Sequence, residues 1–171
     1  MSNLSSSMQN IEDVTKGGIG YYNSPLGKIE IIEIDNMIHS IAFCSVDPPR
    51  NRNAISSELT ESAIIQLDEY FSNKRREFEL PLFPAPSHFQ TKVRNALLCV
   101  PYGQTRSYKD IAFSIGLPNC ARAVGRANHL NPIAIVVPCH RIIGHNQKLV
   151  GYAYGLDTKL KLLELERNLS N

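Results

Sequence analysis

The sequence lacks any long apolar run. No segment of the 171 residues is long and apolar enough to span a membrane, so we expect no membrane association. The Ser- and Asn-rich start carries neither a basic patch nor an apolar stretch, which favours a flexible tail over residues 1–18 rather than a signal peptide. Internal repeats and low-complexity segments are also missing. The length suffices for one domain or two small ones with a real hydrophobic core.

Cysteine is scarce as well. The four cysteines form no C-x-x-C pair and no regular framework (Cys44, Cys99, Cys120 and Cys139). Neither a disulfide scaffold nor a metal site is therefore indicated. Reduced thiols fit a cytoplasmic location, or a nuclear one if the source is eukaryotic.

Charge is divided unevenly along the chain. Residues 1–85 carry an excess of acidic side chains, and residues 86–171 an excess of basic ones. A one-sided positive field is typical of a nucleic-acid surface, although basic faces also occur on proteins that bind none. The prolines of residues 80–86 suit an extended linker. We therefore predict an N-terminal domain with its linker over residues 19–85 and a C-terminal domain over residues 86–171.

The two halves also differ in their hydrophobic pattern. Alternation over residues 20–43 predicts an antiparallel meander, and helical spacing predicts helices over residues 57–71 and 89–99. Further on, Ser107 fits a capping box that opens a helix, and Asn119 is suited to cap the next one, which runs to about residue 129.

A helix, a short glycine-containing turn and a second helix make the helix-turn-helix pattern. In the second helix Arg122 and Arg126 lie one turn apart among small residues, where a DNA backbone could approach closely. A solvated basic face is the alternative interpretation. The predicted fold class is α+β: a small N-terminal α/β domain with an antiparallel sheet, then a mostly helical domain that contains a helix-turn-helix.

The most reactive side chains of the chain stand together between two apolar runs. Cys139, His140 and Arg141 follow the β-branched run 135–137, which predicts a buried strand that Pro138 ends. A thiol beside an imidazole and a guanidinium is expected to favour the thiolate, the nucleophilic form of cysteine. A buried structural cysteine beside a satisfied core histidine is the alternative.

The C-terminal segment predicts a helix from residue 156 or 157 to about residue 169, with Leu156, Leu160 and Leu163 on its core face. Glu166 lies among leucines, where a carboxylate is costly unless it is paired. The imidazole and guanidinium next to the cysteine are its obvious partners. Such a Glu–His–Cys relay would let the imidazole take the thiol proton. A glutamate exposed at a fraying helix end is the alternative.

Together these motifs resemble a known family. Pro138-Cys139-His140-Arg141, preceded by Asn131-Pro132 and followed by Gly151-Tyr152 and Gly155, resembles the active-site signature of O6-alkylguanine-DNA alkyltransferases (methylated-DNA–protein-cysteine methyltransferases). Further segments resemble the family in the same order: residues 67–71, 89–93, 100–105, 107–108 and 121–125. The resemblance covers about residues 20–169.

The resemblance implies direct reversal of DNA damage. The C-terminal domain would enter the minor groove of double-stranded DNA and flip the damaged nucleotide into a pocket beside Cys139. The thiolate would take the alkyl group from O6-alkylguanine in one in-line displacement, with O4-alkylthymine as a candidate second substrate. The product is a thioether, so transfer would be irreversible and occur once per molecule. No cofactor or metal is implied, and a monomer would suffice.

The resemblance also implies roles for individual residues. His140 would act as base through a water, Glu166 would orient it, Tyr108 would donate to the flipped base, Asn131 would brace the active-site turn, and Arg141 would be structural. Arg122 would fill the space of the flipped nucleotide. The remaining DNA contacts would come from Ala121, Ala123, Gly125 and Arg126. The substrate pocket would be formed by Tyr108, Val137, Pro138, Tyr152, Ala153, Tyr154 and Gly155.

Some positions depart from the family pattern. Arg94 stands where tryptophan is common, Arg126 where the residue is usually small, Gln147 where glycine is frequent, and Tyr154 occupies the pocket lip. These departures concern substrate range rather than chemistry. Two other functions remain as alternatives. A non-catalytic helix-turn-helix DNA-binding protein leaves Cys139 unexplained, and a Cys-His hydrolase leaves the basic helix pair unexplained.

Overall fold

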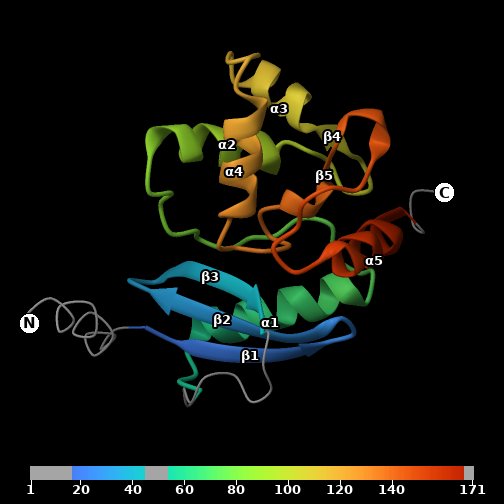
Figure 1. Ribbon diagram of the computed structural model, residues 1–171. Coiled ribbons are helices and arrows are strands. Elements are labelled where there is room, and N and C mark those ends of the chain that lie inside the picture. Colours follow the sequence, from blue (N-terminus) through green and yellow to red (C-terminus); the bar gives the residue numbers. More distant parts are fainter. Residues whose placement is uncertain (1–16, 45–53, 168–171) are drawn as a thin grey trace, which may run out of the picture.

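The computed structural model describes residues 17–44 and 54–167 (Figure 1). The predicted tail over residues 1–18 therefore lies almost wholly outside the described residues. No helix within the described ranges has the length and apolar character needed to cross a membrane.

A three-stranded antiparallel sheet confirms the predicted meander. Strands β1 (Ile19–Ser24), β2 (Gly27–Ile34) and β3 (Met37–Phe43) lie side by side in the order of the chain. Both connecting turns require left-handed backbone, at Gly27 with φ +126° and at Asp35 and Asn36 with φ of 52° and 58°. Glycine, asparagine and aspartate adopt this region at the lowest cost, so the turn residues fix the register of the sheet.

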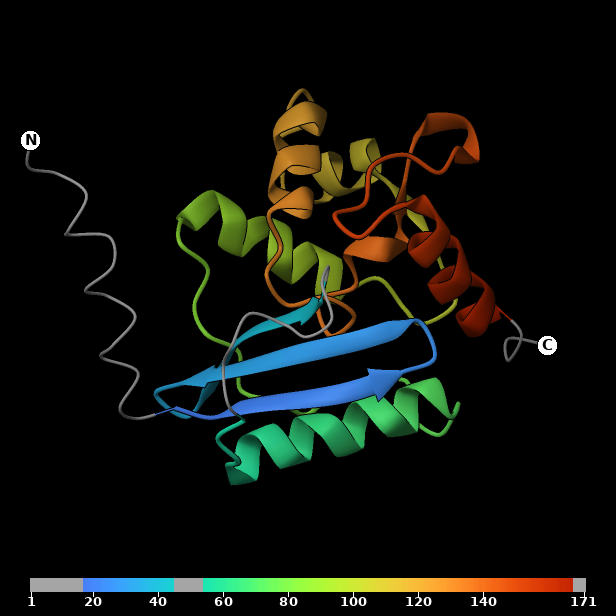
Figure 2. The ribbon, with the colours of Figure 1, turned by 60° about the horizontal axis from the view of Figure 1, so that its bottom comes forward.

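Helix α1 (Glu58–Phe71) covers one face of the sheet, and the C-terminal helices lie on the other side (Figure 2). A capping box between Ser57 and Thr60 starts α1. Beyond the helix, the predicted linker is extended and lies along β3, where Ile38 N donates to Pro81 O and Phe83 N donates to Ile38 O. The domain boundary between residues 85 and 86 falls after this segment and stays a prediction.

The described part of the C-terminal half contains four α-helices: α2 (His88–Leu98), α3 (Tyr108–Ser114), α4 (Ala121–His129) and α5 (Leu156–Arg167). Helices α3 and α4 pack together and against α2, as expected for a helix-turn-helix. The capping box at Ser107 is present. The predicted cap at Asn119 is wrong, because Cys120 stands at the N-cap and no side chain among the described residues caps α4 there.

The run before Cys139 is buried but is not a strand. Residues 134–136 form a turn in which Ile135 has φ 70°, and a short 3-10 helix, η2 (Cys139–Arg141), follows. The Asn131 side chain bonds to backbone at both ends of this run, accepting from Ile133 N and donating to Val137 O. The apolar side chains of this run are buried in the turn just as they would be in a strand, so the hydrophobic pattern does not distinguish the two. After η2 the apolar pair is a strand, β5 (Ile142–Ile143), which pairs with β4 (Arg106–Ser107).

The core face of α5 also differs from the prediction. Leu163 is buried as expected, but Leu156 and Leu160 are 47% and 39% exposed. Glu166 has no exposed surface, as its expected pairing requires, and Lys159 is turned inward as well, also with no exposed surface. The helix is therefore rotated so that these two polar side chains face buried partners, an orientation that a hydrophobic pattern cannot indicate.

Candidate active site

Cys139 begins η2 at the floor of a small cavity and is 4% exposed. Asn131 Nδ2 lies 3.2 Å from Cys139 Sγ and also donates to Val137 O at 3.0 Å. Asn128 Nδ2, from the end of α4, donates to Cys139 O at 3.2 Å. Two amides therefore fix the cysteine from both its side chain and its backbone.

The thiol environment is less electropositive than the sequence suggested. Burial raises the pKa of Cys139, and the hydrogen bond from Asn131 and the charge of Lys159 offset only part of that rise. Arg141 does not supply the expected positive charge to the thiol, because its guanidinium is bound to Glu166. The prediction of a thiolate favoured by both neighbours is therefore wrong. Cys139 rests as a thiol and needs a base.

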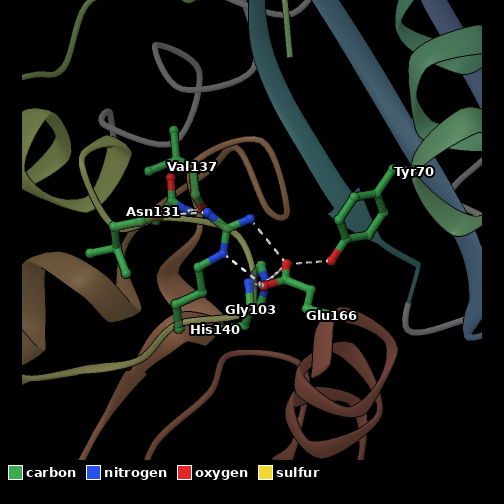
Figure 3. A network of polar contacts seen from close by, with 8 residues as sticks. Tyr70, Gly103, Asn131, Val137, His140 and Glu166 are labelled. Carbon is green, nitrogen blue, oxygen red and sulfur yellow. Dashed lines mark hydrogen bonds and ion pairs between the residues drawn. The ribbon is translucent and has the colours of Figure 1, made fainter. Parts of the chain in front are cut away.

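Glu166 lies at the centre of a buried polar network (Figure 3). Its Oε1 accepts from His140 Nε2 at 2.8 Å and from Tyr70 Oη at 2.8 Å. Its Oε2 accepts from Arg141 Nε at 2.9 Å and from Gly103 N at 3.1 Å. The structure thus places the carboxylate against both partners that the sequence suggested and adds two that it did not.

Burial alone would raise the pKa of Glu166, but the hydrogen bonds and positive charges of His140 and Arg141 outweigh it and hold that pKa well below its usual range. The carboxylate is therefore ionised. Since an ionised carboxylate only accepts, His140 must carry its proton on Nε2.

The other imidazole nitrogen of His140 is then free to act as a base. His140 Nδ1 is buried and has no hydrogen-bond partner among the described residues. Burial lowers the pKa of His140, although Glu166 acts in the opposite direction. At neutral pH the residue next to Cys139 is thus a neutral imidazole with an available lone pair.

The cavity above the thiol has a volume of about 30 Å³, which is enough to hold ordered water. Four of the predicted pocket residues line it: Tyr108, Tyr152, Ala153 and Tyr154. Three other residues predicted to form the pocket, Val137, Pro138 and Gly155, do not line this cavity in the described structure. The structure adds Gly125, Asn128, His129 and Gly151.

The lip of this cavity joins three parts of the chain. Tyr108 Oη, from the first helix of the helix-turn-helix, donates to Val150 O at 3.2 Å. Its ring lies beside Gly125 of α4, where an added Cβ would come within 3.6 Å of it. Tyr154 packs against Phe43 of β3, with ring centroids 5.2 Å apart. Opening the cavity to a larger group therefore requires movement of the lip.

Lys159 is a site residue that the sequence interpretation missed. Its Nζ donates to Ile142 O at 2.6 Å, Val150 O at 2.9 Å and Gly151 O at 3.1 Å, which ties the lip to the strand after the active site. Burial lowers the pKa of Lys159 to about 8, against the attraction of a Cys139 thiolate. The signal was its spacing of seven residues from Glu166, which puts both on one face of α5.

Helix α4 presents its basic residues outward. Arg122 and Arg126 are exposed, whereas Val124 and Asn128 on the other side are buried. Of the small residues predicted to meet DNA, Ala123 is exposed, and Ala121 and Gly125 are partly buried. The departure at Arg94 lies outside the site, where Arg94 Nη1 donates to Phe83 O of the extended linker.

Comparison with known families decides the classification. Residues 19–84 match the ribonuclease-like domain of 6-O-methylguanine DNA methyltransferase, and residues 88–168 match its DNA-binding domain. The chain belongs to the 6-O-methylguanine DNA methyltransferase family.

Individual members are similar in sequence and in fold. A methylated-DNA–protein-cysteine methyltransferase of Mycolicibacterium paratuberculosis is 44% identical over 86% of this chain and 91% of its own length. Those of Methanosarcina barkeri and Mycobacterium leprae are 57% and 54% identical, but the match spans only 65% and 64% of their lengths. The crystal structure of Mycobacterium tuberculosis O6-methylguanine methyltransferase superimposes with a TM-score of 0.77 at 40% identity, covering 88% of this chain and 93% of that one. A complex of the M. tuberculosis protein with DNA gives 0.78 at 41% identity, covering 86% and 92%.

Proposed function

We propose that this protein repairs O6-alkylguanine in DNA by transferring the alkyl group to Cys139. The observation that carries the proposal is a cysteine at a cavity floor next to a buried His140–Glu166 pair, in which His140 Nδ1 has no hydrogen-bond partner within residues 17–44 and 54–167. The name of the family relatives and the solved complex of one of them with DNA support it.

The chemical step is a displacement at the alkyl carbon. The proton of Cys139 passes through a water to His140 Nδ1, and Glu166 stabilises the imidazolium that forms. The thiolate forms an S–C bond as the C–O6 bond breaks, and its electron pair stays on the guanine. The guanine anion then takes up one proton from water and the His140 imidazolium releases one to water, so atoms and charge balance without another reactant. Tyr108, at the cavity lip, donates a hydrogen bond to the base as negative charge develops on it.

The product explains why the protein would act once. A thioether is a poor leaving group, and the other cysteines, Cys44, Cys99 and Cys120, do not line the cavity as the structure describes it. Asn131 holds the thiol and the turn in place, and Arg141 anchors Glu166. We propose that the protein acts as a monomer.

DNA would bind through α4 in the minor groove. Its small residues would allow a close approach to the DNA backbone, and Arg122, which is exposed, would fill the gap left by a flipped nucleotide. Flipping is needed because O6 of guanine is inaccessible to a buried thiol within a duplex. The cavity of about 30 Å³ accommodates a methyl group, so the lip formed by Tyr108 and Tyr154 would move to admit the base.

The two alternative functions are less well supported. A Cys-His hydrolase would leave the exposed basic side chains of α4 unexplained. A non-catalytic DNA-binding protein would have no use for a histidine held by an ionised carboxylate beside a buried thiol.

Duplex DNA with one O6-methylguanine tests the proposal. Incubation should add one methyl group per protein molecule, measured by intact-protein mass, and peptide mapping should locate it at Cys139. Cys139→Ser should abolish transfer but keep DNA affinity, because the thiol contacts no phosphate. Repeated turnover, or a methyl group mapped to Cys44, Cys99 or Cys120, would contradict the proposal.

A further inference from the structure

A tyrosine of the N-terminal half reaches the centre of the candidate active site. Tyr70 lies near the end of α1 and has no exposed surface. Its Oη donates to Glu166 Oε1 at 2.8 Å across a sequence separation of 96 residues (Figure 3). The same oxygen accepts from His140 Nε2 at 2.8 Å. Arg141 Nη2 also donates to it, at 3.1 Å. Tyr70 and Arg141 therefore share with His140 the charge of one carboxylate oxygen.

Packing alone does not require the Tyr70 hydroxyl. The ring is surrounded by aromatic neighbours, with centroids 5.3 Å from Phe71, 5.6 Å from Phe78 and 6.1 Å from Tyr102. A phenylalanine would fill the same space and would leave no polar atom to satisfy among these rings. Packing therefore does not account for the Tyr70 hydroxyl, whereas its hydrogen bond to Glu166 does.

The N-terminal half holds the site at a second point. Ile41 of β3 donates through its N to Pro132 O at 2.9 Å and accepts through its O from Ala134 N at 2.8 Å. These residues start the turn that leads to Cys139. The sheet thus fixes the active-site turn, and α1 contacts the carboxylate behind the histidine.

We propose that Tyr70 is a positioning residue that sets the basicity of His140 by sharing Glu166 Oε1, so that the N-terminal half is part of the catalytic network. The inference rests on the proposed alkyl transfer and deepens it. Tyr70 touches neither substrate nor thiol, and it acts only through Glu166.

The direction of the effect follows from electrostatics. Each donor to a carboxylate disperses part of its negative charge, so removal of Tyr70 Oη leaves more charge to stabilise the His140 imidazolium. The pKa of His140 then rises in Tyr70→Phe. Glu166→Gln removes the charge altogether and lowers it. Both variants retain the other charged and ionisable groups that interact with the pair: Arg141, Lys159, Tyr102 and Tyr152.

The opposite signs give a sharp experiment. Single-turnover methyl transfer from saturating O6-methylguanine DNA is measured from acidic to alkaline pH. The acid limb of the rate should move to higher pH in Tyr70→Phe, by about 0.5–1 pH unit for one hydrogen bond, and to lower pH in Glu166→Gln. In a Glu166→Gln background, Tyr70→Phe should add no further rise.

Tyr102→Phe is the matched control. It removes another hydroxyl near Glu166, but Tyr102 Oη has no hydrogen-bond partner in the part of the chain that the structure describes. Its acid limb should coincide with that of the wild type. Urea unfolding of each variant checks that the fold is retained.

A second measurement separates this inference from the proposed function. Titration of His140 by NMR in the protein without DNA reports its pKa whether or not transfer occurs. A wild type that transfers no methyl group would contradict the proposed function, while a raised His140 pKa in Tyr70→Phe would still support the inference. If Tyr70→Phe titrates like Tyr102→Phe, or shifts in the direction of Glu166→Gln, the role assigned to Tyr70 is wrong.

Discussion

Individual polar residues give the candidate site its chemistry, and most of them act on another residue rather than on substrate. The Asn131 side-chain amide donates to Val137 O, which stabilises the turn before Cys139, and also to Cys139 Sγ. Glu166 keeps the His140 proton on Nε2 and so leaves Nδ1 as the base. Because burial raises the thiol pKa, thiolate formation depends on these few contacts.

Lys159 should assist transfer in a way that depends on pH. Its positive charge lowers the pKa of Cys139, so Lys159→Met should raise that pKa and leave less thiolate at neutral pH. Single-turnover transfer should slow by about tenfold for each unit by which the pKa of Cys139 rises. Because burial lowers the pKa of Lys159 to about 8, the wild type loses this charge as the pH rises through that value. The advantage of wild type over variant should therefore shrink above about pH 8.

The neighbouring Lys161→Met provides the control for this prediction. Lys161 is exposed and pairs only at the surface with Asp157, at 2.7 Å. Its replacement should leave the rate at each pH close to that of the wild type. A ratio of wild type to Lys159→Met that stays constant with pH would show that Lys159 acts only as an anchor of the cavity lip.

Whole elements differ in how well the sequence predicts them. The meander and helices α1 to α3 follow from local signals, namely turn residues, capping residues and hydrophobic period. Helix α4 is found where it was expected, but without the expected cap. The turn before Cys139 does not, because its shape depends on the Asn131 side chain and on pairing with β3. The burial of Lys159 in α5 does not either, since its backbone partners lie outside the helix and leave no sign in the local pattern.

Helix α4 allows a prediction that separates its two exposed arginines. Only one of them can enter the base stack, so we expect Arg126 to contact backbone phosphate. Arg126→Ala should lower the slope of log K against log salt by about 1 and weaken damaged and undamaged DNA alike. Transfer at saturating DNA should barely change. Binding titrations at several salt concentrations give the slope.

Arg122→Ala is the natural comparison, because it should slow transfer far more in duplex than in single-stranded DNA. Extruding a nucleotide costs a few kcal/mol only when a duplex must be opened. An unchanged salt slope for Arg126→Ala would make that residue a bystander. A collapse of its transfer rate at saturation would instead place it in nucleotide flipping.

Across the whole molecule, the site is formed by contacts between distant segments. Cys139, His140 and Glu166 were identifiable as candidates because reactive side chains in apolar surroundings need partners. Their contacts with the N-terminal half could not be predicted, because nothing in the sequence around Tyr70 or Ile41 indicates that they bind residues 132–166. Such long-range pairings depend on how the two halves pack, which neither periodicity nor capping encodes.

The buried network should also govern how the whole fold responds to acid. The pKa of Glu166 is well below its ordinary value in the folded state. As the pH falls, the Glu166 carboxylate is therefore protonated in the unfolded chain while it is still ionised in the folded protein. The stability contributed by Glu166 is therefore present above the ordinary glutamate pKa and is lost progressively below it. Glu166→Gln cannot titrate and lacks this contribution at every pH. The difference in the free energy of unfolding between wild type and Glu166→Gln should narrow from neutral pH to about pH 3, as measured by urea denaturation. A difference that stays constant over this range would mean that folding does not lower the pKa of Glu166. A difference that instead shifts in favour of the wild type toward acid pH would mean that Glu166 is protonated in the folded protein, and the tautomer assigned to His140 would lose its basis.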